Sequence, residues 1–71
     1  MEMTESILEY AFNKAIRKDD YQLEHICMTI IENWGIISYG TKLEIQCTAN
    51  NFAKYSTEKD LLLIINNLDM V

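Results

Sequence analysis

The apolar positions in the first half of the chain recur at intervals of three and four residues, a spacing typical of amphipathic helices. The first run predicts a helix from about Thr4 to Arg17, capped by Thr4 or Ser6. The second run predicts a helix that Asp19 caps and that ends at Gly35. Because only a very short turn separates the two, we expect them to pack as an antiparallel hairpin.

The pattern changes after Gly35 to one typical of strands. Residues 42–48 alternate between polar and apolar, with Leu43, Ile45 and Cys47 on one side. This alternation predicts a strand, because a strand places every second side chain on the same face. Residues 36–39 predict a strand before it, turns are expected at 40–41 and 50–51, and residues 52–55 predict a third short strand or one helical turn.

The last apolar run predicts a C-terminal helix that Ser56 or Thr57 caps. Leu61, Ile64, Ile65 and Leu68 share one face of it, Leu62 points away from that face, and Leu63 lies to one side. A helix that is apolar nearly all round needs cover on more than one side. In a chain of 71 residues we expect a second subunit to give that cover, so the sequence predicts a homodimer. The predicted oligomer interface consists of Leu61, Leu62, Leu63, Ile65 and Leu68.

Together these elements predict one α+β domain over residues 1–71. Its order is a helical hairpin, a small antiparallel β-meander and a C-terminal helix packed on one face of the sheet. The alternative is a small all-α bundle, in which residues 36–55 form turns and a short helix.

The charge of the chain predicts what kind of partner it binds. The chain has eleven acidic and six basic residues and a net charge of −5, and seven of the acids fall in residues 1–32. Phosphate repels such a chain, so nucleic-acid binding is disfavoured and a basic protein partner is favoured. The simpler interpretation is that the charge only keeps a small apolar protein in solution. The predicted partner-binding acids are Glu2, Glu5, Glu9, Asp19, Asp20 and Glu24.

The side chains that carry chemistry form no catalytic or metal-binding pattern. His25 and Cys27 lie on different faces of the second predicted helix, which is a poor geometry for a Cys–His nucleophile pair. One histidine and two cysteines at unrelated spacings do not make a zinc site, and two glycines do not make a phosphate-binding loop. Cys27 and Cys47 fall in apolar stretches, so we expect buried thiols rather than a disulfide. We therefore expect no enzymatic activity, no metal and no cofactor.

The expected function is that of a non-catalytic, small acidic protein-binding module. Such a module would regulate or inhibit a larger basic protein, for example one that handles nucleic acid. Phage and mobile-element inhibitors, antitoxins and immunity proteins share this size and charge as a class. The acidic N-terminus and short apolar runs argue against export and membrane insertion, so a cytoplasmic location is expected. Two alternatives stay open: a small dimeric transcriptional regulator that binds DNA, and a structural oligomerisation subunit.

Overall fold

Helices account for all regular structure in residues 4–70, the part of the chain that the computed structural model describes. The elements are α1 (Glu5–Lys18), α2 (Leu23–Glu32), the 3₁₀ turn η1 (Trp34–Ile36), α3 (Tyr39–Phe52) and α4 (Lys59–Asn66). None of the described residues forms a strand. The protein is therefore a small all-α bundle, and the predicted α+β fold with a β-meander is wrong.

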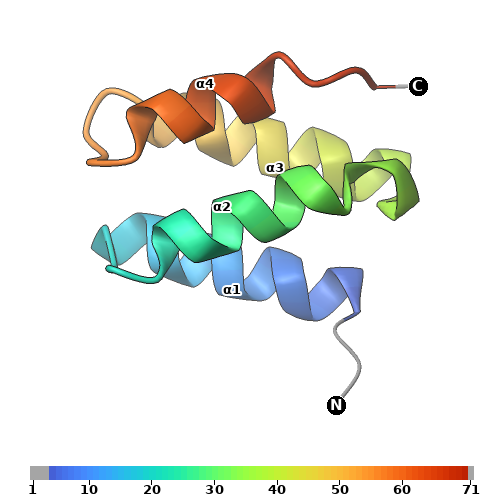
Figure 1. Cartoon of the computed structure of the whole chain (residues 1–71), viewed down its shortest axis with the longest axis horizontal. Coiled ribbons are helices and arrows are strands. Elements are labelled where there is room, and N and C mark those ends of the chain that lie inside the picture. The colour runs from blue at the N-terminus through green and yellow to red at the C-terminus, as the bar shows by residue number, and fades with distance from the viewer. Residues whose placement is uncertain (1–3, 71) are drawn as a thin grey trace.

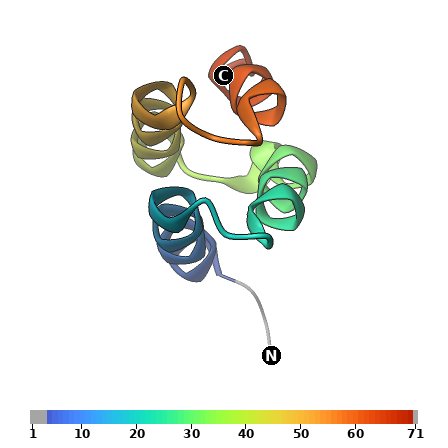
Figure 2. The same cartoon turned by 90° about the vertical axis from the view of Figure 1, so that its left-hand side faces the viewer.

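The four helices form two stacked hairpins. α1 and α2 make one antiparallel hairpin, α3 and α4 make the other, and both have the same orientation (Figure 1). As a result α1 packs beside α3 and parallel to it, and α2 packs beside α4 in the same way. Seen from the end, α1 and α3 form one layer and α2 and α4 form the second (Figure 2). Neighbouring helix pairs of α-solenoids are stacked in this manner.

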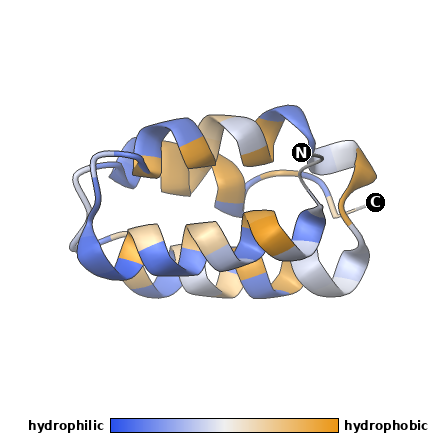
Figure 3. Cartoon of the chain, turned by 90° about the horizontal axis from the view of Figure 1, so that it is seen from below, coloured by the Kyte–Doolittle hydropathy of each residue, from blue (hydrophilic) through white to orange (hydrophobic). Residues whose placement is uncertain are grey.

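The core lies between the two layers and receives side chains from all four helices. Each helix carries both hydrophobic and hydrophilic residues along its length, as expected of amphipathic helices (Figure 3). Burial of a large apolar side chain stabilises a fold by about 1.5–3 kcal/mol. The largest completely buried side chains are Phe12, Leu23, Ile30, Ile45, Leu62 and Ile65.

The first hairpin largely follows the sequence pattern. The Thr4 hydroxyl caps α1 by accepting a hydrogen bond from the Ile7 N–H at 3.3 Å. The prediction that Asp19 caps the second helix is wrong, because Asp19 ends α1 with a left-handed backbone (φ 49°). Aspartate tolerates this conformation better than most residues. α2 also ends earlier than predicted, at Glu32, and the chain then tightens into η1.

Residues 39–52 form a helix where the alternating pattern predicts a strand. The buried positions of α3 are Lys42, Ile45 and Ala49, three and four residues apart, whereas Leu43 and Cys47 are exposed. The residues around Ile45 are lysine, leucine, glutamate and glutamine, which are strong helix formers. Because Lys42 is polar, its buried position does not count toward a helical pattern of apolar residues. Leu43, Ile45 and Cys47 are then the apolar residues that remain, and their spacing of two is typical of a strand. The predicted turns at 40–41 and 50–51 are the first and last turns of α3.

α4 buries a different face from the one predicted. Leu62, predicted to point away from the apolar face, is completely buried, whereas Ile64 is 47% exposed. Glu58 occupies the N-cap position, and its N–H donates a hydrogen bond to the Ser56 hydroxyl at 3.0 Å. A run of five apolar residues contains several possible faces, so periodicity alone does not select one.

Substitution of Ile45 tests the assignment of α3. Ile45→Ala removes a completely buried side chain. We therefore expect the free energy of unfolding to fall by about 2–5 kcal/mol. Leu43→Ala is the matched control, because Leu43 is 47% exposed. We expect it to change that free energy by less than about 1 kcal/mol. Urea unfolding followed by circular dichroism measures both, and equal losses would indicate the shared buried face of a strand.

Candidate functional site

Two of the predicted partner-binding acids, Glu5 and Asp19, join the hairpins to each other. Glu5, at the start of α1, accepts hydrogen bonds from the Ser38 N–H at 3.0 Å and the Ser38 hydroxyl at 2.8 Å. At the other end of α1, the Asp19 carboxylate accepts hydrogen bonds from the Ser56 hydroxyl and from the N–H and hydroxyl of Thr57, at 3.0–3.3 Å. Both carboxylates therefore act as acceptors within the fold.

Glu9 of α1 faces Glu44 of α3, so the contact between these helices also contains a pair of carboxyl groups. A hydrogen bond between them requires a proton on one of the two, and together with partial burial it raises the pKa of Glu9 from 4.5 to about 7. By contrast, hydrogen bonds from Ser38 lower the pKa of Glu5. The α1–α3 contact thus favours the ionised form of Glu5, and it favours a proton shared between Glu9 and Glu44.

The remaining predicted acids lie elsewhere. Asp20 accepts a hydrogen bond from the Gln22 N–H at 3.0 Å in the turn between α1 and α2. Glu24 is exposed on α2, and Glu2 lies outside the described residues. The structure therefore brings the five described acids to three places: the α1–α3 contact, the turn after α1, and α2.

The predicted oligomer residues differ in how much surface they offer. Leu62 and Ile65 are completely buried within the chain, so they have no area to give to a partner. Leu61 and Leu68 are half-buried and pack against the core. Leu63 is exposed. What remains of this predicted interface on the surface is Leu63 and the outer parts of Leu61 and Leu68.

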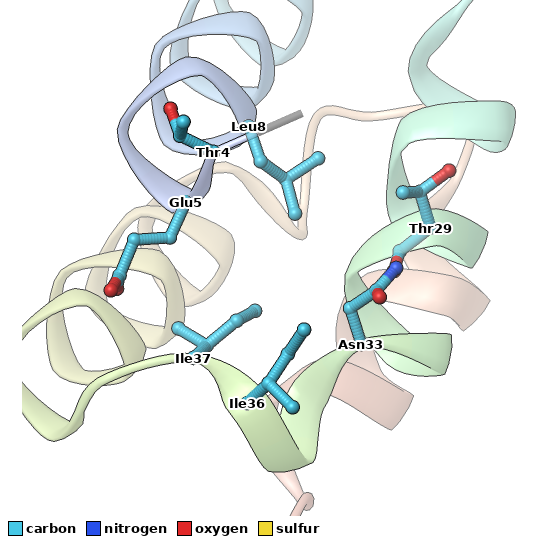
Figure 4. Close-up of a pocket in the computed structure, with 7 residues that line it drawn as sticks. All are labelled: Thr4, Glu5, Leu8, Thr29, Asn33, Ile36 and Ile37. Atoms are coloured by element: carbon cyan, nitrogen blue, oxygen red, sulfur yellow. The ribbon is translucent and has the colours of Figure 1, made fainter. Parts of the chain in front are cut away.

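A cavity of about 190 Å³ opens beside the N-terminus of α1 (Figure 4). Small-molecule sites usually measure about 300–1,000 Å³, so this cavity has room for roughly one side chain. Its polar groups already make internal hydrogen bonds: the Thr29 hydroxyl donates to the His25 carbonyl at 2.9 Å, and the Asn33 amide donates to the Thr29 carbonyl at 2.8 Å. The cavity is lined by Thr4, Glu5, Leu8, Thr29, Asn33, Ile36 and Ile37.

The layer formed by α2 and α4 presents apolar side chains beside acidic ones. Met28 is 44% and Ile64 47% exposed, and Ile31 packs partly buried against the core. Burial, followed by the nearby charge of Glu58, raises the pKa of the Cys27 thiol to about 12. Ile26 and Thr29 of α2 line cavities shared with α1, so the opposite side of α2, which carries Ile31, faces the other neighbour of this helix, α4. We define the α2–α4 face as Glu24, Met28, Ile31, Glu32, Asp60, Leu61, Ile64 and Leu68.

The two layers differ in charge. α2 contains Glu24 and Glu32 and neither lysine nor arginine, and in α4 Lys59 and Asp60 balance each other, so this layer carries −2. α1 and α3 together contain four basic and three acidic residues, which gives +1. The order of charges along the chain does not predict this difference, because each layer combines one helix from the first half of the chain with one from the second half. The signal that was present in the sequence is the absence of basic residues from the second helix.

No known protein family, curated protein or solved structure matches this chain. Within residues 4–70, no group of three or more histidine, cysteine, aspartate or glutamate side chains is placed to hold a metal ion. Over the same range, no helix has both the length and the apolar character needed to cross a bilayer. Cys27 and Cys47 are free thiols, the first buried as predicted and the second exposed. The α2–α4 face is the candidate site because it combines exposed apolar side chains with acidic charge.

Removal of the Asp19 carboxylate tests the junction between the hairpins. Asp19→Gly keeps the left-handed backbone without strain but deletes the acceptor for Ser56 and Thr57. We expect the free energy of unfolding in urea to fall by about 1–2 kcal/mol. Ser56→Ala, alone and in the Asp19→Gly background, completes a double-mutant cycle, because the hydrogen bond between Ser56 and Asp19 is lost in either single variant. Fully additive losses would show that this carboxylate does not bind the loop.

The Glu9–Glu44 pair predicts a stability that depends on pH. Because the folded-state pKa of Glu9 is raised, the folded protein binds a proton more tightly than the unfolded chain, and this stabilisation is lost as pH rises from 4.5 to about 7. Glu9→Gln mimics the protonated form. We expect the variant to unfold at a higher temperature than the wild type above pH 7, with the advantage vanishing near pH 4.5.

The size of this effect is limited by solvent, so we expect no more than about 1 kcal/mol. Glu44→Gln should give the same pH profile, because either change removes the pair. Glu24→Gln, on the opposite layer, is the control and should follow the wild-type profile. Thermal unfolding at a series of pH values measures all four proteins. Parallel profiles for wild type and Glu9→Gln would contradict a shared proton.

Proposed function

We propose that this protein is a non-catalytic acidic protein-binding module that regulates or inhibits a larger basic protein. The observation that carries the proposal is the net charge of −2 on the α2–α4 layer. The acids that give this charge share the layer with exposed apolar side chains. An acidic surface speeds the encounter with a cationic partner and disfavours partners of like charge. Exposed apolar side chains supply the area whose burial stabilises the complex once it has formed.

The acids that serve this function differ from most of those that the charge pattern predicts. Glu5 and Asp19 already accept hydrogen bonds from Ser38, Ser56 and Thr57. Glu24, which the pattern did predict, is exposed and belongs to the α2–α4 face. The acidic contribution to binding is therefore assigned to Glu24 and its neighbours on this layer.

We propose the cytoplasm as the compartment in which the module acts. Both Cys27 and Cys47 are free thiols, and Cys47 is exposed. Exposed free thiols persist in a reducing compartment, whereas secreted chains of this size generally pair their cysteines.

The experiment is affinity capture from a lysate of the cells that encode the protein, followed by identification and purification of the captured protein. Binding is then measured by calorimetry at several salt concentrations. We expect one basic protein, with an affinity that falls as salt rises because screening weakens the attraction of opposite charges. The variant with Glu24→Lys, Glu32→Lys and Asp60→Lys should bind more weakly, by at least about tenfold, while its circular dichroism stays that of the wild type.

Other outcomes would overturn the proposal. Recovery of only further copies of the chain would favour the structural oligomerisation subunit. Salt-sensitive binding to duplex DNA, without a protein partner, would favour the transcriptional regulator.

A further inference from the structure

We infer that the α2–α4 face binds a basic amphipathic helix of the partner. This inference rests on the proposed function and names the part of the partner that is recognised. Its evidence is the arrangement of two parallel helices, the apolar residues along the line where they meet, and the acids beside that line.

The shape of the face suits a helix. α2 and α4 are parallel neighbours in one layer, and a third helix packs well along the line between two such helices. On α2, Met28 and Ile31 are three residues apart; on α4, Leu61 and Ile64 are also three apart, and Leu68 follows in the bend just after that helix. Each set therefore forms one stripe along its helix. α2 has 10 residues and α4 has 8. At 1.5 Å per residue the face is about 12–15 Å long, the length of two to three helical turns.

The apolar residues of the face differ in depth, which gives it relief. Ile31, Leu61 and Leu68 are partly buried and pack against the core, whereas Met28 and Ile64 stand about half exposed. A bound helix would contact this surface with apolar side chains at positions i, i+3 or i+4, and i+7. The flexible thioether of Met28 adapts to different partner side chains.

Charge complementarity selects a basic helix as the occupant. Glu24 and Glu32 lie near the two ends of α2, and Asp60 lies in the first turn of α4. The one basic residue of this layer, Lys59, lines a different depression together with Lys54 and Leu63. Acids therefore border the apolar stripes, and lysine or arginine on the flanks of a bound helix would pair with them.

A second copy of the chain is a less favourable occupant. Each copy carries −5, which opposes association between copies. In a two-fold contact of the α2–α4 face with itself, the acids of one copy lie against the acids of the other. The exposed apolar residues of α1, Ile7 and Tyr10, line a groove that contains both Lys14 and Asp20, so this groove offers the acids of the face no net opposite charge, whereas a basic helix does.

The test uses the whole chain and a synthetic peptide of leucine and lysine, about 14 residues long, whose leucines follow one helical stripe. One control peptide has the same composition with its leucines spread evenly, and a second has glutamate in place of lysine. Amide chemical shifts of the isotope-labelled protein map the contact, and calorimetry measures the affinity. We expect the stripe peptide to shift amides of α2 and α4, and both control peptides to bind at least about tenfold more weakly.

Matched variants locate the charge and the apolar contact. Glu24→Lys should weaken binding of the stripe peptide by about fivefold to tenfold, whereas Glu44→Lys, the same change on the opposite layer, should leave it within about twofold. Ile64→Ala should weaken binding, whereas Tyr10→Ala, an exposed apolar residue of α1, should not. Circular dichroism of each variant confirms that the fold is retained.

Several results would overturn the inference. These are amide shifts confined to α1 and α3, equal weakening by Glu24→Lys and Glu44→Lys, equal binding of the evenly spread peptide, and no binding of the stripe peptide. A dimer in sedimentation experiments that Ile64→Lys dissociates would show that a second copy occupies the face.

Failure of this inference is distinct from failure of the proposed function. A captured basic partner that protects a different face would leave the acidic module in place and refute the site. Binding of the peptide to the face, in the absence of any basic partner in the lysate, would do the reverse.

Discussion

The contact between α1 and α3 holds the two hairpins in one stack, and the rest of the structure depends on it. A hairpin of about 30 residues buries too little surface to fold alone, so each needs the other to complete a core. Carboxylates fix both ends of this contact, Glu5 through Ser38 and Asp19 through the loop before α4. Towards the Asp19 end, the Arg17 guanidinium lies 5.6 Å from the centre of the Phe52 ring. Because the hairpins are stacked in this way, α2 and α4 become neighbours, and the α2–α4 face is a product of that stacking.

The acidic residues serve two purposes that net charge does not distinguish. Glu5 and Asp19 accept hydrogen bonds within the fold, in each case from donors of the opposite hairpin. Glu24 belongs to a layer that has no arginine and only one lysine, so its negative charge is available to attract a positively charged partner. An acid contributes to recognition only when no donor of its own chain has engaged it. Three of the six acids predicted to bind a partner, Glu5, Asp19 and Asp20, accept hydrogen bonds from their own chain in this way.

The success of prediction from sequence varied along the chain, for reasons that particular residues make plain. The first helix has a clear polar face, so its period identifies both the helix and its buried side chains. α3 was mistaken for a strand because Lys42 occupies a buried position, where its stem packs inside while its ammonium lies 5.5 Å from the centre of the Trp34 ring. In α4 the helix was predicted correctly, but its uniform apolar run did not reveal that Leu62 is buried.

The candidate site was less accessible to prediction than the helices. Its two halves, Glu24 to Glu32 and Asp60 to Leu68, are separated by the whole of α3, and only the stacking of the hairpins brings them together. The sequence did contain the charge of each half and the apolar excess of the last helix. It did not contain the order in which the helices pack, and that order decides which charges share a surface.

The single tryptophan gives the protein an optical reporter at the edge of this surface. The Trp34 indole N–H donates a hydrogen bond to the Asp69 carbonyl at 2.6 Å, and Trp34 is only 7% exposed to solvent. Asp69 directly follows Leu68, a residue of the α2–α4 face. Any molecule that displaces this segment changes the hydrogen bond and the polarity around the indole. The emission spectrum of the unlabelled protein is thereby linked to events at the face, without an attached dye.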